Sequence, residues 1–370
     1  MFTWQTLAGD ADRGPRCGRL TTPHGAVETP AFIPVGTRAT VKGVLPETLR
    51  AVGAQMVLVN TYHLMLRPGE QVVRDLGGLH AVMAWDGPIL TDSGGYQVFS
   101  LADRRRVTDD GVTFRSHIDG AELSLTPETA VAAQNALGAD IIMVLDVCPP
   151  YPCPRPEVEE AVRLTLAWAR RCQSAQGRRD QALWGIVQGG VEMDLRERCA
   201  RDLVAMDFPG YAVGGVSVGE GHAHLCRVLD VTAPLLPAAK PRYLMGVGEP
   251  RDVVAAVARG IDLFDCVLPT RNGRNASAFT FEGPIRLRNE RFRTDAGPIE
   301  TGCDCPACRA FSRGAIRHFF QAGEMMGPIL VSIHNLRFFT RLFGRLREAI
   351  QAGQFHEHAQ ALLDRYAQTD

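Results

Sequence analysis

Eight short apolar runs recur along the chain, and each is continuous instead of alternating with polar residues. Such runs are typical of parallel strands that are buried on both faces. Helical patterns separate most of them; in TPETAVAAQNALG, Thr126 is placed to cap the helix and Glu128 falls in its first turn. The pattern predicts an α/β protein built as a (β/α)8 TIM barrel. The predicted strands lie in residues 31–35, 56–59, 89–92, 141–146, 183–188, 211–215, 242–247 and 263–268.

Two segments interrupt this alternation. Residues 104–125 alternate polar and apolar positions around Asp-Gly pairs, which predicts a β-hairpin inserted after the third strand. From about residue 283 the chain carries an Arg-rich, strand-like stretch, then a Cys cluster and a long helical pattern. We therefore predict a catalytic barrel over residues 1–282, with the insertion at about 104–125, and a metal-binding C-terminal subdomain over 283–370 that packs on the barrel.

The C-terminal cluster places Cys303, Cys305 and Cys308 within six positions. Three thiols at this spacing predict a metal site that needs a fourth ligand, and from spacing alone either His318 or His334 can supply it. A site closed by three Cys and one His is the tetrahedral arrangement of structural zinc, with no position left for water. The metal is therefore expected to hold the subdomain together, and the chemistry is expected elsewhere.

Composition narrows the class of protein. The chain has 370 residues, 45% of them hydrophobic, which suffices for one large core or two moderate ones. Its formal net charge of −1 does not indicate a nucleic-acid-binding protein as a whole, so contact with a polyanion requires a local patch. We find no signal-peptide pattern and no run approaching the ~18 apolar residues of a membrane helix. The other Cys are scattered, which is typical of reduced thiols in a cytoplasmic protein.

Polar residues stand at the carboxyl ends of the predicted strands, where TIM barrels carry their sites. Because a barrel interior is packed with branched apolar side chains, carboxylates and an amide at one rim are costly unless they are used. Singly, each has an ordinary interpretation; Asp92 in TDSGG has common turn chemistry. Together they suggest two carboxylates for acid–base or nucleophilic work, with a third group and amides reading a polar ligand. The residues are Asp92, Asp146, Gln188, Gly214, Gly215, Gly246 and Asp265.

Several long strings occur in order over essentially the whole chain: TDSGGYQVFSL, GVTFRSHIDG, LTPE, GIVQGGV, YAVGGVSVGEG, YLMGVG, LFDCVLPTRNGRN and the Cys-x-Cys-x2-Cys…His arrangement. In these strings the chain resembles the bacterial tRNA-guanine transglycosylases of the queuine tRNA-ribosyltransferase family. The resemblance implies exchange of the wobble guanine of tRNAs with a G-U-N anticodon for 7-aminomethyl-7-deazaguanine (preQ1), in queuosine biosynthesis. It also implies that Asp265 is the nucleophile of a double displacement and that Asp92 is the general acid/base.

The resemblance further assigns the base pocket. Asp146 is the expected acceptor for ring N–H and exocyclic amine, while the side chain of Gln188 and the backbone N–H of Gly215 are the expected donors to the carbonyl oxygen. Because adenine reverses this pattern, discrimination against it should be strong. Tyr96 and Met245 match positions that sandwich a flipped-out base. Three more residues match the loop that reads the 7-substituent and favours preQ1 over queuine: Val216, Val218 and Glu220.

RNA contact and assembly are also implied. Arg271 and Arg274 match positions that read the flanking uridines, and His334 is the family's fourth ligand to structural zinc. A homodimer is carried over from the family. A possible phosphate track, equally well a solvated face, runs through Arg286, Arg288, Arg291 and Arg293. The sequence departs from the family at Val147 (commonly Glu), Glu249 (Lys in some relatives) and Ala276 (usually Gly).

Two other functions compete with this interpretation. A non-catalytic RNA-binding subunit is disfavoured because both Asp92 and Asp265 are retained. A sugar-phosphate or aldol barrel enzyme needs a Schiff-base Lys or phosphate-binding glycines, and neither Lys42 nor Lys240 lies at the end of a predicted strand. Archaeal-type relatives modify a different tRNA position and usually carry RNA-binding domains beyond this length.

Overall fold

We analysed a computed structural model of the chain, which describes residues 2–101 and 105–367. An eight-stranded parallel sheet lies at its centre, in the order β4-β14-β13-β12-β11-β10-β6-β5. A parallel bridge between Val35 and Leu58 joins the two outer strands and closes the sheet into a barrel. The TIM-barrel prediction is confirmed. The strands are β4 (Ala31–Pro34), β5 (Val57–Val59), β6 (Ile89–Thr91), β10 (Ile141–Met143), β11 (Ala182–Val187), β12 (Tyr211–Val213), β13 (Arg242–Leu244) and β14 (Leu263–Cys266).

Each strand coincides with one of the predicted apolar runs, and the strand residues are buried on both faces. Several strands are shorter than their runs. The run 141–146, for example, leaves the sheet after Met143 and continues as a buried loop to Asp146. Apolar character therefore extends past the hydrogen-bonded ladder, because the loops at this rim also face the interior. No described helix combines the length and apolar character needed to cross a membrane.

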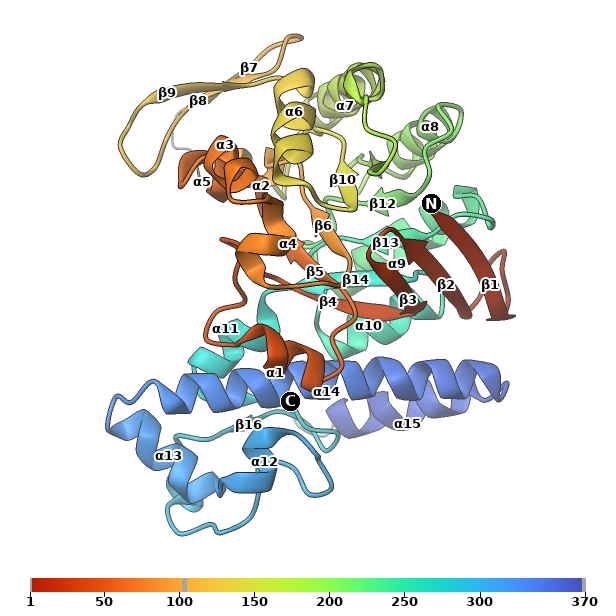
Figure 1. Ribbon diagram of the computed structural model, residues 1–370. Coiled ribbons are helices and arrows are strands. Elements are labelled where there is room, and N and C mark those ends of the chain that lie inside the picture. Colours follow the sequence, from red (N-terminus) through yellow and green to blue (C-terminus); the bar gives the residue numbers. More distant parts are fainter. Residues whose placement is uncertain (1, 102–104, 368–370) are drawn as a thin grey trace.

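Helices surround the barrel (Figure 1). Thr126 caps α6 as predicted, since its side chain accepts a hydrogen bond from the Thr129 N–H. The helices between the strands are α1 (Pro46–Ala51), α2 (Thr61–Leu66), α3 (Glu70–Asp75), α4 (Gly78–Met83), α5 (Gly95–Leu101), α6 (Pro127–Leu137), α7 (Arg155–Ala175), α8 (Met193–Val204), α9 (His222–Thr232) and α10 (Pro250–Val257), with α11 (Leu268–Arg274) following β14.

An antiparallel sheet that we did not predict precedes the barrel. It consists of β1 (Thr3–Gly9), β2 (Arg16–Thr22) and β3 (Gly25–Thr29), in that order. Arg16 at the start of β2 is fully buried and donates two hydrogen bonds to Asp262, at 2.9 and 2.6 Å. Asp262 directly precedes β14, so this ion pair attaches the sheet to the amino-terminal end of the barrel.

The insertion after β6 differs from the predicted hairpin. It contains three antiparallel strands, β7 (Arg105–Val107), β8 (Val112–Arg115) and β9 (Glu122–Leu125), in the order β7-β8-β9. Both Asp-Gly pairs make turns, and two turns connect three strands. Residue 104, the predicted start, lies outside the described residues. In Figure 1 the insertion projects from the barrel on the side opposite α14.

The C-terminal region is mostly helical. The Arg-rich stretch 283–293 was predicted to be strand-like, but only β16 (Ile285–Arg286) pairs there, with β15 (Ser277–Ala278), and a 3-10 turn follows at Glu290–Phe292. That prediction was largely wrong, because only Arg286 lies in a strand, whereas Arg288 and Arg293 lie in turns and Arg291 lies in the 3-10 turn; all four are exposed. The helices are α12 (Pro306–Ala310), α13 (Arg313–Gln321), α14 (Met326–Gln351) and α15 (Phe355–Ala367).

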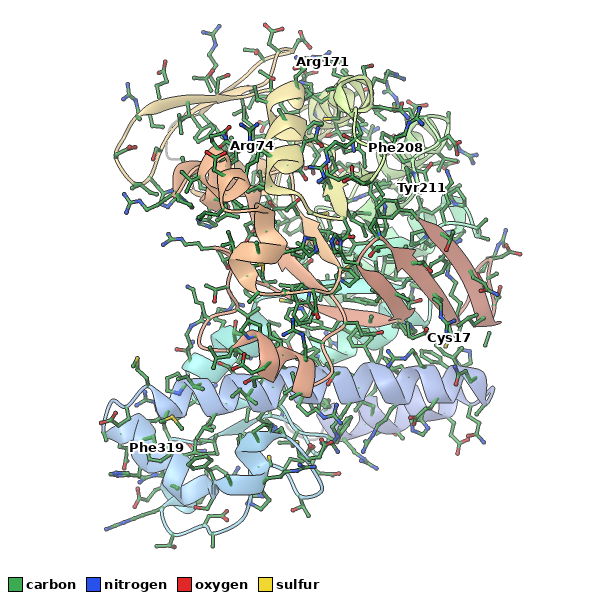
Figure 2. All side chains as sticks on the ribbon, viewed as in Figure 1. Cys17, Arg74, Arg171, Phe208, Tyr211 and Phe319 are labelled. Carbon is green, nitrogen blue, oxygen red and sulfur yellow. The ribbon has the colours of Figure 1, made fainter. Side chains whose placement is uncertain are left out.

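Helix α14 lies between the barrel and the rest of the C-terminal region (Figure 1). Phe339 packs on Phe32 of β4 with ring centroids 4.5 Å apart, and Phe343 packs on Phe264 of β14 at 5.3 Å. Near its C-terminal end, the Cys17 thiol of β2 lies 3.5 Å from the Arg347 carbonyl oxygen (Figure 2). The helix therefore covers the seam between the first and last barrel strands. The division of the chain at 282/283 stays a prediction.

Candidate active site and metal centre

A cavity of about 630 Å³ opens at the carboxyl ends of the barrel strands. Its wall combines carboxylates and an amide with glycine-rich loops, which suits a small polar ligand. Arg274 is not part of this wall. The predicted residues that line it are Asp92, Tyr96, Asp146, Gln188, Gly215, Val216, Val218, Glu220, Met245, Asp265 and Arg271. The barrel thus brings together, from positions 173 residues apart (92 to 265), the polar residues that the sequence analysis grouped by their place at strand ends, and it adds residues that only the resemblance had assigned.

Asp265 at the end of β14 is buried, 9% exposed, and is held by neutral donors alone. The Tyr243 hydroxyl donates to its Oδ1 at 2.5 Å and the Gly246 N–H donates to the same oxygen at 2.8 Å. Burial raises the pKa of Asp265 to about 6, partly opposed by these two hydrogen bonds. The carboxylate is therefore ionised at neutral pH, and both donors fix one oxygen while the other is left for chemistry.

Asp92 follows β6 and accepts several hydrogen bonds. Asn60 donates to Oδ2 at 2.5 Å and Gln97 donates to the same atom at 2.8 Å, while the Thr61 N–H donates to Oδ1 at 2.9 Å. Burial raises the pKa of Asp92 despite these donors. The negative charge of Asp92 in turn raises the pKa of Asp265. Two carboxylates that repel each other in one cavity favour different protonation states, as an acid and a nucleophile require.

Asp146 lies beyond β10 and is paired with Gln188 at the end of β11. The Gln188 amide nitrogen donates to Asp146 Oδ2 at 2.6 Å. Burial raises the pKa of Asp146 to about 6, so its carboxylate is an acceptor at neutral pH. Because an amide nitrogen carries two hydrogens, Gln188 keeps one donor for a ligand. The pair offers an acceptor beside a donor, which matches the edge of a guanine-like base.

Gly214 and Gly215 form the wall next to Gln188. A Cβ on Gly214 would lie 2.7 Å from the Gln188 amide nitrogen, and one on Gly215 would lie 2.5 Å from its amide oxygen. Gly215 also has a φ of +64°, which disfavours a side chain. Behind these glycines the fully buried Arg196 of α8 donates to the carbonyl oxygens of both, at 2.7 and 3.0 Å.

The loop after β12 completes the cavity. Glu220 accepts a hydrogen bond from the Val218 N–H at 2.9 Å, and the Ser217 hydroxyl donates to the Gly246 carbonyl oxygen at 2.9 Å. These contacts link the loop to itself and to the loop that holds Asp265. Tyr96 is 49% exposed although it lines the cavity, so its ring is accessible for stacking.

Arg271 and Arg274 lie on α11, directly after β14. Arg271 is exposed at the edge of the cavity, as a residue that contacts a long polyanion should be. Arg274 is half-buried, and its Nη1 has no hydrogen-bond partner among the described residues. The two arginines are the first cationic side chains after Asp265 in the sequence.

The three departures from the family occupy different environments. Val147 is buried, and its N–H donates to the Thr165 hydroxyl at 3.0 Å, which anchors the loop beside Asp146 without a carboxylate. Glu249 is exposed and contributes to the cavity wall. Ala276 is buried with a φ of +60°, a left-handed conformation that costs an alanine about 1–2 kcal/mol.

Cys303, Cys305, Cys308 and His334 converge in the C-terminal region. The three sulfurs lie 3.7, 3.8 and 3.3 Å from His334 Nδ1. Zinc bound tetrahedrally at ordinary bond lengths separates sulfur and nitrogen by about 3.6 Å, so the donors fit that ion. His334 Nε2 donates to the Phe279 carbonyl oxygen at 2.8 Å, which leaves Nδ1 as the ligand. The group includes His334 and not His318, which resolves the alternative left open by spacing.

A second group of potential ligands lies at the opposite end of the barrel. Asp140, directly before β10, is buried and contacts His24 at 2.8 Å and His80 at 3.4 Å. The two imidazole rings stack with centroids 3.6 Å apart and planes only 21° from parallel. Nearly parallel stacked rings cannot both aim a nitrogen lone pair at one ion. We therefore interpret this group as two histidines sharing a buried carboxylate.

Several residues of the site were missed by the sequence analysis. Tyr243 and Asn60 hold the two proposed reactive carboxylates, and Arg196 holds the glycine wall. Tyr243 lies inside an apolar run, where a tyrosine is indistinguishable from core. Arg196 lies on a helix with many charged residues, where its burial leaves no mark in the sequence. Asn60 directly follows the run 56–59, and its place at a strand end was an available signal.

Comparison with known proteins gives one consistent result. The family model for Queuine tRNA-ribosyltransferase matches residues 11–368. The chain is 54% identical to the Queuine tRNA-ribosyltransferase of Pelotomaculum thermopropionicum, covering 96% of both chains. It is 52% identical to that of Thermus thermophilus, over 97% of this chain and 92% of the relative. It is 55% identical to that of Synechococcus elongatus, over 93% and 90%.

Proposed function

This chain belongs to the queuine tRNA-ribosyltransferase family, and from that premise we propose that it exchanges the wobble guanine of tRNAs with a G-U-N anticodon for preQ1. Membership makes it a tRNA-guanine transglycosylase, a pentosyltransferase that acts on tRNA and a base. The observation that carries the proposal is Asp265, a buried carboxylate held through one oxygen by neutral donors. Such a group is both ionised at neutral pH and unneutralised by a cation, as a nucleophile should be.

The proposed reaction has two displacements at the same sugar carbon. In the first, the free oxygen of Asp265 attacks C1′ of the ribose, the bond from C1′ to guanine N9 breaks, and a proton from Asp92 assists departure of guanine. In the second, preQ1 attacks C1′ through N9, the bond to Asp265 breaks, and Asp92 takes the proton that preQ1 releases. Two inversions return the original configuration, and the RNA backbone is never cut.

Base selection is proposed to use Asp146, Gln188 and Gly215. Ionised Asp146 accepts from ring N–H and exocyclic amine, and the remaining Gln188 hydrogen and the Gly215 N–H donate to the carbonyl oxygen. Their mutual arrangement supports this because Gln188 already bonds to Asp146 and packs on Gly215. An adenine would face Asp146 with an acceptor and leave buried groups unpaired.

The remaining parts of the proposal concern substrate size, RNA contact and zinc. Tyr96 and Met245 are proposed to stack on the base, and Val218 is proposed to exclude the larger substituent of queuine, with Val216 and Glu220 shaping that loop. Arg271 and Arg274 are proposed to contact the anticodon loop. Zinc, held by the three Cys and His334, would fix the C-terminal region to α14. A homodimer in the cytoplasm is proposed from the family alone.

The zinc proposal can be tested separately. Cys308→Ser should lose the metal and lower thermal stability while the barrel stays folded, because structural zinc contributes directly to folding. Metal analysis and thermal unfolding of both proteins measure this. A wild-type protein that contains no zinc and is equally stable in chelator would contradict the proposal.

The main experiment tests the covalent intermediate. Wild-type protein incubated with G-U-N tRNA and labelled guanine should incorporate label, and should accumulate a denaturation-resistant protein–RNA adduct when no incoming base is supplied. Peptide mapping should locate the adduct on Asp265, and Asp92→Asn should bind tRNA yet exchange poorly. An adduct on Asp92 would reverse the two roles. A protein that binds tRNA without exchange or adduct would instead be a non-catalytic subunit.

A further inference from the structure

Arg196 is a buried cation with an unusual set of partners. Its side chain is fully buried, and no salt bridge to it is found in the part of the chain that the structure describes. All of its hydrogen bonds go to backbone carbonyl oxygens. The distances are 2.9 Å to Gly190, 3.0 Å to Val187, 2.7 Å to Gly214 and 3.0 Å to Gly215. Burying a charge without an opposite charge is costly, so the arrangement calls for a reason.

The geometry of the peptide between Gly214 and Gly215 gives a reason for this arrangement. In a trans peptide the carbonyl and the N–H point in opposite directions. Because the Gly214 carbonyl points at Arg196, the N–H of the same peptide, which belongs to Gly215, points away from it. Gly215 lines the cavity and Arg196 does not, so that N–H faces the cavity side. No acceptor for it is found among the described residues.

Hydrogen bonds on both sides keep the Gly214–Gly215 peptide from flipping. Gly214 N–H donates to the Val187 carbonyl oxygen at 3.0 Å, and Arg196 donates to that same oxygen. The Gly215 carbonyl is held as well, so the peptides on both sides of Gly215 are fixed by one guanidinium. Rotation of either would leave a buried charge and buried carbonyl oxygens unpaired, which costs more than the single bond gained.

We propose that Arg196 is a positioning residue for base recognition, which aims the Gly215 N–H at the carbonyl oxygen of the base and places a positive charge behind that donor. The inference rests on the proposed function. When guanine departs, negative charge spreads onto its carbonyl oxygen, so this donor is stronger in the transition state than in the bound substrate. The substrate class that follows is a purine-like base with a strong acceptor at that position.

A base that differs from guanine only at the carbonyl oxygen can distinguish a role of Arg196 in positioning the Gly215 N–H from a role in protein stability alone. In 6-thioguanine, sulfur replaces the carbonyl oxygen and accepts hydrogen bonds only weakly, while the ring N–H and the amine are kept. Equilibrium binding of guanine and 6-thioguanine should be measured for the wild type, Arg196→Met and Arg196→Lys. Arg201→Ala is the matched control, because Arg201 lies on the same helix but pairs with Glu197 at the surface.

We expect the ratio of guanine affinity to 6-thioguanine affinity to change. Arg196→Met should weaken guanine binding about tenfold or more and 6-thioguanine binding far less, so the preference for guanine collapses. Arg196→Lys should fall between, and Arg201→Ala should match the wild type. Parallel weakening of both bases, or no change in either, would overturn the proposal. If the wild type itself bound no guanine, the proposed function would fail first.

A measurement on the wild type covers the case in which neither Arg196 variant folds. When glycine is the only labelled amino acid and carries 13C in its carbonyl and 15N in its amide, an NMR experiment that detects the 13C–15N peptide bond selects only glycine amides that follow another glycine. The chain has four Gly-Gly pairs. One of the four selected signals, that of Gly215, should shift strongly with guanine and weakly with 6-thioguanine. Four signals that respond equally to both bases would contradict the assignment.

Discussion

Two buried aspartates at the two ends of strand β14 have opposite surroundings. Asp262, directly before the strand, receives two hydrogen bonds from the Arg16 guanidinium and one from the Arg242 N–H. Asp265, inside the same strand, receives bonds only from a hydroxyl and an N–H. Burial raises the pKa of both, but a guanidinium opposes the rise at Asp262 while the charge of Asp92 adds to it at Asp265.

The difference teaches how the two ends of one barrel are used. At the amino-terminal end, charge is neutralised and ties the N-terminal sheet to the barrel. At the carboxyl-terminal end, negative charge is left without a cation, which costs stability and retains reactivity. The same residue type, three positions apart, is therefore structural at one end and is proposed to be chemical at the other.

The largest expected effect belongs to Asp265→Asn. The amide keeps the shape and the two hydrogen bonds to Oδ1 but cannot attack, so exchange should fall by a factor of ~10³ or more, while tRNA binding is largely kept. Because ionised Asp265 is unfavourable in its buried position, the variant should also be more stable than the wild type at pH 7.5, by about 1–3 kcal/mol. Guanine exchange kinetics and denaturant unfolding measure both. A variant that lost stability together with activity would erase the contrast with Asp262.

The matched change at the other end is Asp262→Asn. It leaves the Arg16 guanidinium buried without its carboxylate, so unfolding free energy should fall by about 3–5 kcal/mol. At temperatures where the variant is folded, its exchange rate should stay close to that of the wild type. Denaturant unfolding and guanine exchange, run on both aspartate variants in parallel, test the pair. Loss of exchange in fully folded Asp262→Asn would show that the amino-terminal end of the barrel also takes part in the chemistry.

Acid should sharpen the comparison by removing the charge from Asp265. With a pKa of about 6, Asp265 becomes protonated as pH falls through 6, and exchange at saturating tRNA and guanine should decline about tenfold per pH unit well below that value. A carboxylate whose pKa is raised by folding destabilises the protein when ionised, so the stability advantage of Asp265→Asn should shrink between pH 7 and pH 5. Guanine binding should weaken over the same range in both proteins, because Asp146 also has a pKa of about 6. A stability advantage that is constant with pH would argue against a buried ionised Asp265.

The smallest expected effect concerns Ala276, which follows α11 close to the reactive end. Its φ of +60° is comfortable for glycine and strained for alanine, so Ala276→Gly should stabilise the protein by about 0.5–1 kcal/mol. Exchange kinetics should be unchanged, since Ala276 does not line the cavity. Unfolding free energy from denaturant titration measures the effect. A destabilised Ala276→Gly would mean that the buried methyl group contributes more by packing than the conformation costs.

Much of the barrel was predictable because strand burial leaves a strong mark in the sequence. Eight continuous apolar runs gave all eight strands, and polar residues at their ends gave most of the cavity wall. The candidate metal ligands were partly predictable, since three Cys at short spacing carry the pattern, while the choice between His318 and His334 needed tertiary structure or a resemblance.

Other structural features could not be predicted because their sequence patterns were too weak. The N-terminal strand Thr3–Gly9 alternates exposed and half-buried residues without a strong apolar face, so nothing distinguished it from a loop. The insertion was predicted as a hairpin of two strands although it contains two Asp-Gly pairs, and two turns connect three strands. Arg196 and Tyr243 owe their roles to neighbours far away in the chain, which periodicity does not report.

Helix α14 has a consequence for the order in which the protein is made. A ribosome releases β4 first among the barrel strands and β14 last, but Phe339 and Phe343, which cover their seam, emerge some seventy residues later (339 against 266). Until then the apolar surface of Phe32 and Phe264 is open to water or to a chaperone. The barrel of a growing chain is thus covered only after its C-terminal helix has emerged, and His334 on that same helix would link this step to binding of the proposed zinc.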